Sequence, residues 1–112
     1  METEANAAIV RSLYLSQHDP RSAERDALLD ALSHRYRRFV VAALEDSGQP
    51  LALADLAADV AARDTAESPT IERIRTIKIE LYHVHVPKLA ETGLVAFDRD
   101  RNVVRSTEQS ER

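Results

Sequence analysis

The chain has 112 residues, no cysteine and a formal net charge of −4, from 15 lysines and arginines against 19 aspartates and glutamates. This length predicts a single small domain, and the lack of cysteine excludes a disulfide framework and thiol catalysis and argues against a zinc finger. No apolar run approaches the roughly 20 residues that span a bilayer, and no secretory leader pattern begins the chain, so we expect a soluble cytoplasmic protein. Aromatic residues and glycines are few, which favours helices over a β-sandwich.

Residues 1–22 are predicted to form an N-terminal helix and a linker. Apolar side chains recur at helical spacing between residues 5 and 17, and a proline in the segment 18–22 breaks the pattern. A helix of about three turns is marginal alone, so it should pack either on its own domain or on a second subunit. The pattern leaves both arrangements open. For a homodimer, the candidate interface residues are Ile9, Val10, Leu13 and Tyr14.

A long helix is predicted over residues 23–46, because the apolar residues there form one continuous stripe. Gly48 and Pro50 end it, as a glycine cap followed by a residue that cannot continue a helix. Three arginines on the opposite face provide either a solvated surface or a set of phosphate contacts: Arg35, Arg37 and Arg38.

A strand rung at Leu51 and a short helix from Ala54 to Ala62 are predicted next. The start of this helix is weak. Ala52 and Leu53 occupy the positions where a Ser, Thr or Asp would accept a hydrogen bond from the first turn. The lack of this cap lowers the stability of the helix by roughly 1 kcal/mol.

A second long helix is predicted to begin at Ser68 and Pro69, an N-cap followed by a first-turn proline, and to continue for about twenty residues. Pro87 lies inside it. A proline there removes the hydrogen bond to the carbonyl of His83 and costs about 3 kcal/mol unless the helix bends, so the sequence predicts a kink. Gly93 stands where a C-terminal cap needs a left-handed backbone.

Short β-prone segments follow, at residues 94–97 and 103–104, with a polar turn at 98–102 between them. The order of helix, glycine stop, strand, polar loop and strand is that of the second helix and wing of a winged helix-turn-helix. The predicted fold class is therefore mainly α with a small β-hairpin wing: a winged helix-turn-helix over residues 23–105 with an additional N-terminal helix. Residues 106–112 are all polar and are predicted to be a disordered tail.

The residue types offer little for catalysis or metal binding. The sequence contains no glycine-rich phosphate loop and no candidate nucleophile beside a base, so we expect neither an enzyme nor a cofactor nor a small-molecule substrate. His83 and His85 lie about 200° apart around a helix, whereas chelation from one helix needs residues four apart. We expect no metal site, and the two histidines should either pack and hydrogen-bond or contact DNA.

Duplex DNA is the expected partner, with the second helix in the major groove and the wing on the backbone. A local basic face can bind phosphates on an acidic body, because the field depends on where the charges lie. The wing arginines alternate with Asp98 and Asp100, so phosphate affinity there should be modest. The alternative is a winged-helix protein-interaction module that has lost DNA binding, favoured if these acids and Glu80 neutralise the face. The candidate DNA contacts are Arg35, Arg38, Lys78, His83, Val84, Lys88, Arg99 and Arg101.

Two segments resemble motifs of a winged-helix family of uncharacterised regulators from halophilic archaea. Residues 32–38 (LSHRYRR) resemble its LS-N-x-R-R-R opening, and residues 81–98 (LYHVHVPKLAETGLVAFD) resemble its LYH-x-HLPKLA-x-x-G-x-V-x-Y-D signature. The segment KLAETGLV also looks like the end of the recognition helix in ArsR-type repressors. The resemblance implies a DNA-binding transcription factor, often dimeric. The metal-binding cysteines of ArsR-type repressors are absent, so metal sensing is not expected.

Overall fold

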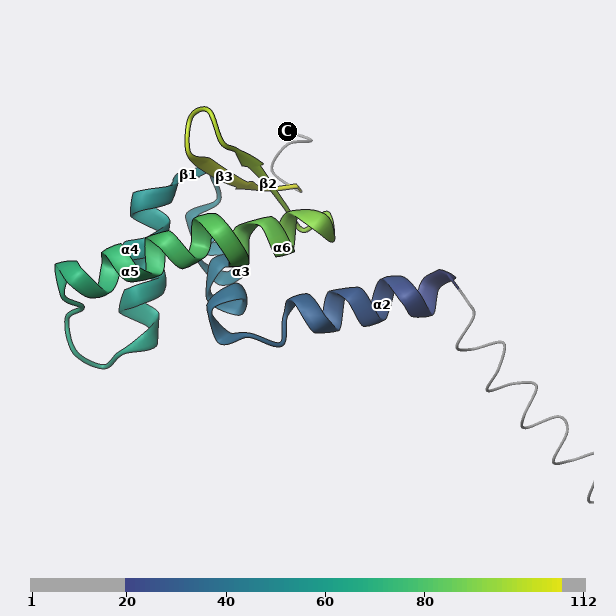
Figure 1. Cartoon of the computed structure of the whole chain (residues 1–112), viewed down its shortest axis with the longest axis horizontal. Coiled ribbons are helices and arrows are strands. Elements are labelled where there is room, and N and C mark those ends of the chain that lie inside the picture. Colours follow the sequence, from purple (N-terminus) through teal and green to yellow (C-terminus); the bar gives the residue numbers. More distant parts are fainter. Residues whose placement is uncertain (1–19, 108–112) are drawn as a thin grey trace, which may run out of the picture. The chain divides into compact units, whose positions relative to one another are not determined.

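A computed structural model describes residues 20–107 of the chain (Figure 1). The chain divides between Asp30 and Ala31 into two compact units. The first unit contributes most of helix α2 (Pro20–Ala31) to the described residues, and the second contains all the other elements. The predicted N-terminal helix over residues 5–17, with its four candidate dimer residues, lies outside the described residues, as do residues 108–112 of the predicted tail.

The single long helix predicted over residues 23–46 is wrong, because the chain forms two helices there. Helix α2 ends at Ala31, and α3 (Arg35–Ser47) begins after a short break. His34 has an extended backbone, with φ −93° and ψ 134°, and its Nδ1 atom accepts a hydrogen bond from the Tyr36 N–H at 3.0 Å. Histidine thus caps α3 in the role usually taken by Ser, Thr, Asp or Asn, and the apolar stripe alone does not reveal this stop.

The predicted glycine cap and the predicted weak helix start are both confirmed. Gly48 ends α3 with φ 68°, and its N–H donates to the carbonyl of Leu44 at 3.0 Å. Strand β1 (Leu51–Ala52) leads into α4 (Leu53–Asp64), whose N-cap residue Ala52 makes no side-chain hydrogen bond. The Leu53 N–H instead donates to the carbonyl of Asn102 at 2.8 Å. A distant turn therefore satisfies one of the first amides of α4.

The second long helix is confirmed as a helical rod in three segments: α5 (Ile71–Glu80), the π-helix η1 (Leu81–His85) and α6 (Val86–Glu91). Its cap differs from the prediction, because Thr70 rather than Ser68 accepts from the N–H of Arg73, at 3.1 Å. Just before Pro87, where the sequence predicts a kink, the helical pattern changes to the π-helix, in which the Val86 N–H donates to the carbonyl of Leu81. Wider π-turns of this kind accommodate a break in the α-helical hydrogen-bond pattern.

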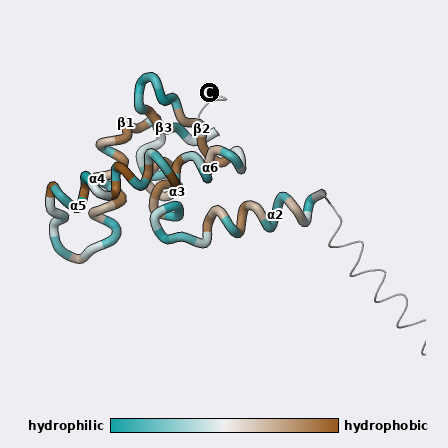
Figure 2. Tube along the Cα trace, in the orientation of Figure 1, coloured by the Kyte–Doolittle hydropathy of each residue, from teal (hydrophilic) through white to brown (hydrophobic). Residues whose placement is uncertain are grey.

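The strands form one small antiparallel sheet in the order β1-β3-β2, with β2 spanning Val95–Asp98 and β3 spanning Val103–Ser106. Val104 on the central strand pairs with Leu51 on one side and with Phe97 on the other. The predicted rung at Leu51 and the predicted hairpin are therefore confirmed. The turn between β2 and β3 is hydrophilic (Figure 2), and Asn102 within it has a positive φ of 53°.

The core of the second unit lies where α4 packs on α3 and α5, α6 packs on β2, and α3 packs on β3. The fold class is thus mainly α with a small antiparallel sheet near the C-terminus. No helix within residues 20–107 combines the length and the apolar character needed to cross a membrane. The fully buried large side chains are Val40, Leu44, Leu53, Leu56, Val60, Ile77, Leu81, Val86, Leu89 and Val104.

Candidate nucleic-acid interface

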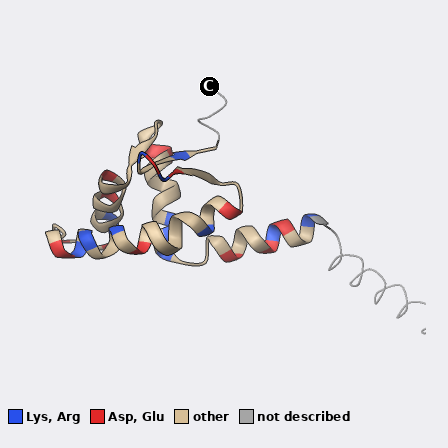
Figure 3. Cartoon of the chain, turned by 45° about the horizontal axis from the view of Figure 1, so that its top comes forward, with Lys and Arg blue, Asp and Glu red and all other residues tan. Residues whose placement is uncertain are grey.

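An open groove runs along α5 and η1 beside the turn of the β2–β3 hairpin. The helical residues that line it are spaced three, four, seven and eight positions from the first, which places them on one face of the rod. Ile79 is 61% exposed on this face. No carboxylate is among the lining residues, and basic residues recur along α5 (Figure 3). The groove is lined by Leu53, Arg75, Lys78, Ile79, Tyr82, His83 and Asn102.

Arg99 is held beside this groove by two aromatic rings. Its guanidinium carbon lies 5.2 Å from the ring centres of both Tyr82 and Phe97. The two rings meet edge to face, with centroids 5.6 Å apart. Cation–π attraction to two rings orients the guanidinium without neutralising its charge. The hairpin turn therefore presents an ordered cation against Tyr82, which lines the groove.

Two acidic residues of this region, Glu80 and Asp98, have partners outside the groove. The carboxylate of Glu80 lies 3.7 Å from Nε2 of His85, away from the lining residues of the groove. Asp98 accepts a hydrogen bond from the Arg101 N–H at 3.2 Å, and its other oxygen lies 3.9 Å from Nε of Arg101. The distribution of charge thus leaves the groove basic on a chain whose net charge is negative.

The structure brings only some of the predicted contact residues together. Lys78 and His83 line the groove, and Arg99 lies beside it. Val84 is 51% exposed but is not among the lining residues, and Lys88 is partly exposed on α6. Arg101 lines a separate hollow on the sheet.

Two other predicted DNA contacts, Arg35 and Arg38, form hydrogen bonds with groups of the protein itself. Arg35 donates through Nε to the carboxylate of Asp64 at 2.7 Å. Nη1 of Arg38 donates to the carbonyls of Leu32 and Ser33, at 2.9 and 3.0 Å. These arginines hold the start of α3 and are not among the residues that line the groove.

Sequence reasoning missed four lining residues: Leu53, Arg75, Tyr82 and Asn102. Arg75 could have been found, because it stands three residues before Lys78 and eight before His83 on the same helix face. The helical spacing of Tyr82 from Val86 and Leu89 instead predicts that Tyr82 belongs to the core. Leu53 and Asn102 reach the groove only through the pairing of β1 with β3, which no local pattern shows.

A buried polar cluster lies behind the groove, between α3 and η1. Arg37 and His85 are only 8% and 5% exposed, and Nη1 of Arg37 is 3.3 Å from Nδ1 of His85. The rings of His34 and His85 are 4.4 Å apart. Burial lowers the pKa of both histidines; the next cause is nearby Arg37 for His34, and His34 for His85. His85 thus belongs to the interior while His83 faces the groove.

Asp64 joins the ends of three helices. Its carboxylate accepts from Arg35 at 2.7 Å, from Arg73 at 2.8 Å and from the hydroxyl of Tyr36 at 3.2 Å. The hydrogen bond from Arg35 is the largest of the causes that lower the pKa of Asp64, to about 2. The network fixes the N-terminal turn of α5, and with it the orientation of the groove-lining face.

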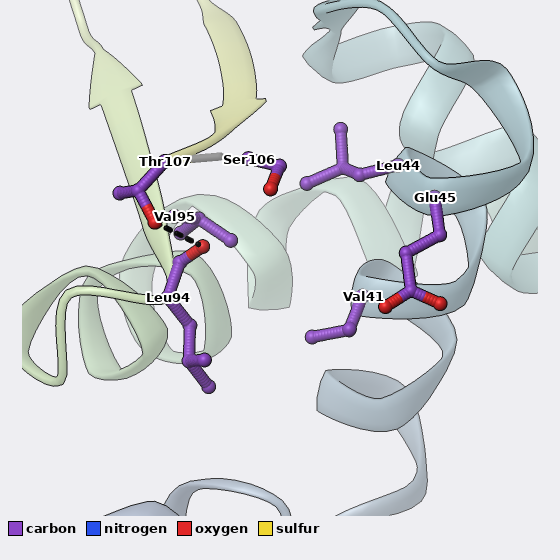
Figure 4. Close-up of a pocket in the computed structure, with 7 residues that line it drawn as sticks. All are labelled: Val41, Leu44, Glu45, Leu94, Val95, Ser106 and Thr107. Atoms are coloured by element: carbon purple, nitrogen blue, oxygen red, sulfur yellow. Dashed lines mark hydrogen bonds between the residues drawn. The ribbon is translucent and has the colours of Figure 1, made fainter. Parts of the chain in front are cut away.

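Two other kinds of functional centre, a small-molecule pocket and a metal site, lack support in the described residues. A cavity between α3 and the base of the hairpin (Figure 4) holds only about 70 Å³, well below the roughly 300 Å³ of small-molecule pockets. The Thr107 hydroxyl donates across one side of it to the carbonyl of Leu94. Within residues 20–107, no group of three or more His, Asp or Glu side chains is arranged to hold a metal ion.

Comparison with known proteins places residues 29–105 in a family described as a domain of unknown function, DUF7344. The match covers most of the second unit and begins at the end of α2. No functionally curated protein and no solved structure matches the chain.

Proposed function

Since the chain belongs to the DUF7344 family, whose description assigns no activity, we propose its function from the geometry of the groove: it is a DNA-binding transcriptional regulator. In this proposal the fold is a winged helix-turn-helix of ArsR-like type, with α5 and η1 as the recognition helix and the β2–β3 hairpin as the wing. The order of elements and the motifs at residues 32–38 and 81–98 support it, as does their resemblance to regulators of halophilic archaea.

The observation that carries the proposal is the absence of carboxylates from the residues lining the groove, where Arg75, Lys78 and His83 share one face. In the major groove, an arginine reads guanine through two hydrogen bonds, and apolar side chains contact the methyl group of thymine. Arg75 and Ile79 supply these two chemistries four residues apart. The groove can therefore discriminate bases as well as attract phosphates.

Arg99 supplies the backbone contact in this arrangement. Its stacking on Tyr82 and Phe97 fixes the guanidinium at the edge of the groove, where the phosphates of a bound duplex would pass. A pre-oriented cation loses little conformational freedom on binding, which favours affinity. One ordered arginine and two nearby cations predict a moderate dependence of affinity on salt.

The test is fluorescence anisotropy with a duplex from the upstream region of the protein's own gene, against a scrambled duplex, at low and at molar salt. We expect saturable binding that prefers the native sequence and is weakened at least tenfold in Lys78→Glu, because the variant places a carboxylate in the groove. Arg63→Gln is the control, since Arg63 pairs with Asp46 and Asp59 away from the groove. Equal affinity of wild type and Lys78→Glu would refute the proposed interface.

The alternative is a protein-interaction module, and the apolar wall of the groove favours it. Ile79 and Tyr82 contribute apolar surface there, and Ile71 at the start of α5 is 71% exposed. A folded protein that binds neither duplex at any salt concentration would support this second function. Dimerisation through residues 5–17 is a separate proposal, tested by light scattering on protein lacking residues 1–17.

A further inference from the structure

Three residues that line the groove on α5 and η1 are spaced four positions apart: Arg75, Ile79 and His83. A helix advances about 1.5 Å per residue, so each lies about 6 Å further along the rod than the one before. All three are exposed, and Ile79 is 61% exposed. They form a row, here called the reading row, along the face that the proposed function assigns to the major groove.

The π-helix helps to keep His83 in the reading row. In a continuous α-helix a step of four residues turns the side chain by about 40°, so the third member of a row drifts away from the first. A π-turn takes more residues per turn, which brings His83 back toward Ile79. The same turn directs His85 inward, where it is 5% exposed and its Nδ1 atom lies 3.3 Å from Nη1 of Arg37. This buried contact holds the rotation of η1 that places His83 in the groove.

The side chains of the reading row differ in what they recognise on the edge of a base. The guanidinium of Arg75 donates two hydrogen bonds that fit O6 and N7 of guanine. Ile79 has no polar side-chain atom and fits the C5 methyl group of thymine. An imidazole N–H of His83 donates to N7, an acceptor that only purines carry in the major groove. The row thus presents three selectivities in a fixed order.

On the premise of the proposed function, we propose that the reading row selects three successive base pairs: a guanine at Arg75, a thymine at Ile79 and a purine at His83. In zinc fingers, three side chains at similar spacing on one helix contact three successive bases, and the helix enters the major groove at an angle. An inclined axis reduces the spacing of about 6 Å between members of the row toward the base step of about 3.4 Å. The order of the three selectivities along the helix then fixes the order of the bases.

The first experiment selects duplexes that bind the full chain from a pool with a random central segment, and measures the affinity of the selected duplex by anisotropy. We expect a guanine, a thymine and a purine at three neighbouring base pairs, in that order. Selected duplexes without this order would overturn the assignment of bases while the proposed function stood. If no duplex is enriched and none binds, the proposed function and the assignment both fail.

A base analogue assigns the thymine contact to Ile79. Uracil in place of the selected thymine lacks only the C5 methyl group and should weaken wild-type binding about fourfold, the effect of burying one methyl group less. Ile79→Ala should bind the two duplexes equally. Because Ile79 is mostly exposed, this substitution leaves the core intact. If Ile79→Ala loses the same fourfold as wild type, another residue contacts the methyl group and the assignment is wrong.

Purines that lack N7 assign the other two contacts. 7-Deazaguanine in place of the selected guanine should weaken wild-type binding about tenfold and leave Arg75→Ala unaffected, and a 7-deazapurine at the third position should cost about fivefold in wild type and nothing in His83→Ala. Thr76→Ala is the control on the same helix, because the Thr76 hydroxyl donates to the carbonyl of Glu72 and does not line the groove. It should retain all three analogue effects. A wild-type chain that prefers one sequence yet responds to none of the analogues would overturn the reading row without affecting the proposed function.

Discussion

Nδ1 of His85 lies 3.3 Å from Nη1 of Arg37, and this contact joins the π-helix to the first turn of α3. A guanidinium can only donate, so this nitrogen of His85 accepts and carries no proton. His34 is constrained in the same way, because its Nδ1 atom accepts from the Tyr36 N–H. A doubly protonated ring cannot accept, and each histidine must therefore be neutral for its contact to persist.

Acid should weaken the fold through these two histidines. Their pKa values in the folded chain lie below the ordinary 6.5, mainly because of burial, so the unfolded chain binds more protons as the pH falls. The stabilisation is complete above pH 6.5 and declines below it, toward the lowered folded values. Glu80 acts to raise the pKa of both histidines, and Arg37 acts to lower it. Arg35 and Arg38 also lower the pKa of His34. Urea unfolding at pH 8 and pH 5 should show a lower free energy of unfolding at pH 5.

His34→Asn separates this effect from general acid denaturation. Asparagine is a good N-cap and should keep α3 in place, while removing one of the two titrating rings. The difference in unfolding free energy between pH 8 and pH 5 should shrink. His83→Asn, in the groove, is the matched control and should keep the wild-type difference. The histidine explanation fails if His34→Asn has the same pH dependence as wild type.

Removing the charge of Asp64 should destabilise the protein by on the order of 2 kcal/mol, because Tyr36, Arg35 and Arg73 lose their shared acceptor. The pKa of Asp64 is lowered to about 2. Its contribution to the stability of the fold is therefore fully present above the usual aspartate pKa of 3.8 and is lost as the pH falls through 2. Urea unfolding of Asp64→Asn at neutral pH measures the loss. Asp59→Asn, at an exposed pair, should cost less than about 1 kcal/mol.

A serine at position 52 should stabilise the protein by about 1 kcal/mol, because its hydroxyl can accept an amide of the first turn of α4. Ala52 is exposed, has φ −62° and ψ 144°, and makes no side-chain cap. The Leu53 N–H is already bound by Asn102, so the gain must come from a later amide. Thermal unfolding of Ala52→Ser measures it. Ala54→Ser places the same hydroxyl inside the helix, and an equal gain there would contradict the capping explanation.

Substitutions in the groove should separate base recognition from phosphate attraction, if the proposed function holds. Arg75→Gln should reduce the preference for the native over the scrambled duplex, at a cost of about 1–3 kcal/mol in specific binding. Arg99→Gln should weaken binding to both duplexes equally and reduce the slope of log affinity against log salt concentration by about 1. Anisotropy titrations at four salt concentrations give both quantities. The reverse pattern would mean that Arg99 reads bases and that Arg75 contacts only the backbone.

The elements that can be predicted from the sequence are those whose signals are local. Gly48 predicted the end of α3, because a left-handed cap needs glycine, and Gly93 likewise has a positive φ of 80°. The rod over residues 71–91, the hairpin and the weak start of α4 followed from spacing, turn chemistry and missing caps. Lys78 and His83 were placed on the exposed face by the same helical periodicity.

Contacts between residues that are distant in the sequence become visible only in the folded chain. The break before α3 depends on His34 acting as a cap and packing against His85, 51 positions along the chain, and the apolar stripe runs through it unchanged. Arg35, Arg75 and Arg105 are the same residue type, yet Arg35 binds Asp64, Arg75 lines the groove, and Arg105 buries an Nη1 atom that has no hydrogen-bond partner among the described residues. Charge and periodicity are properties of the chain, whereas burial and the identity of a partner arise when separate segments pack together.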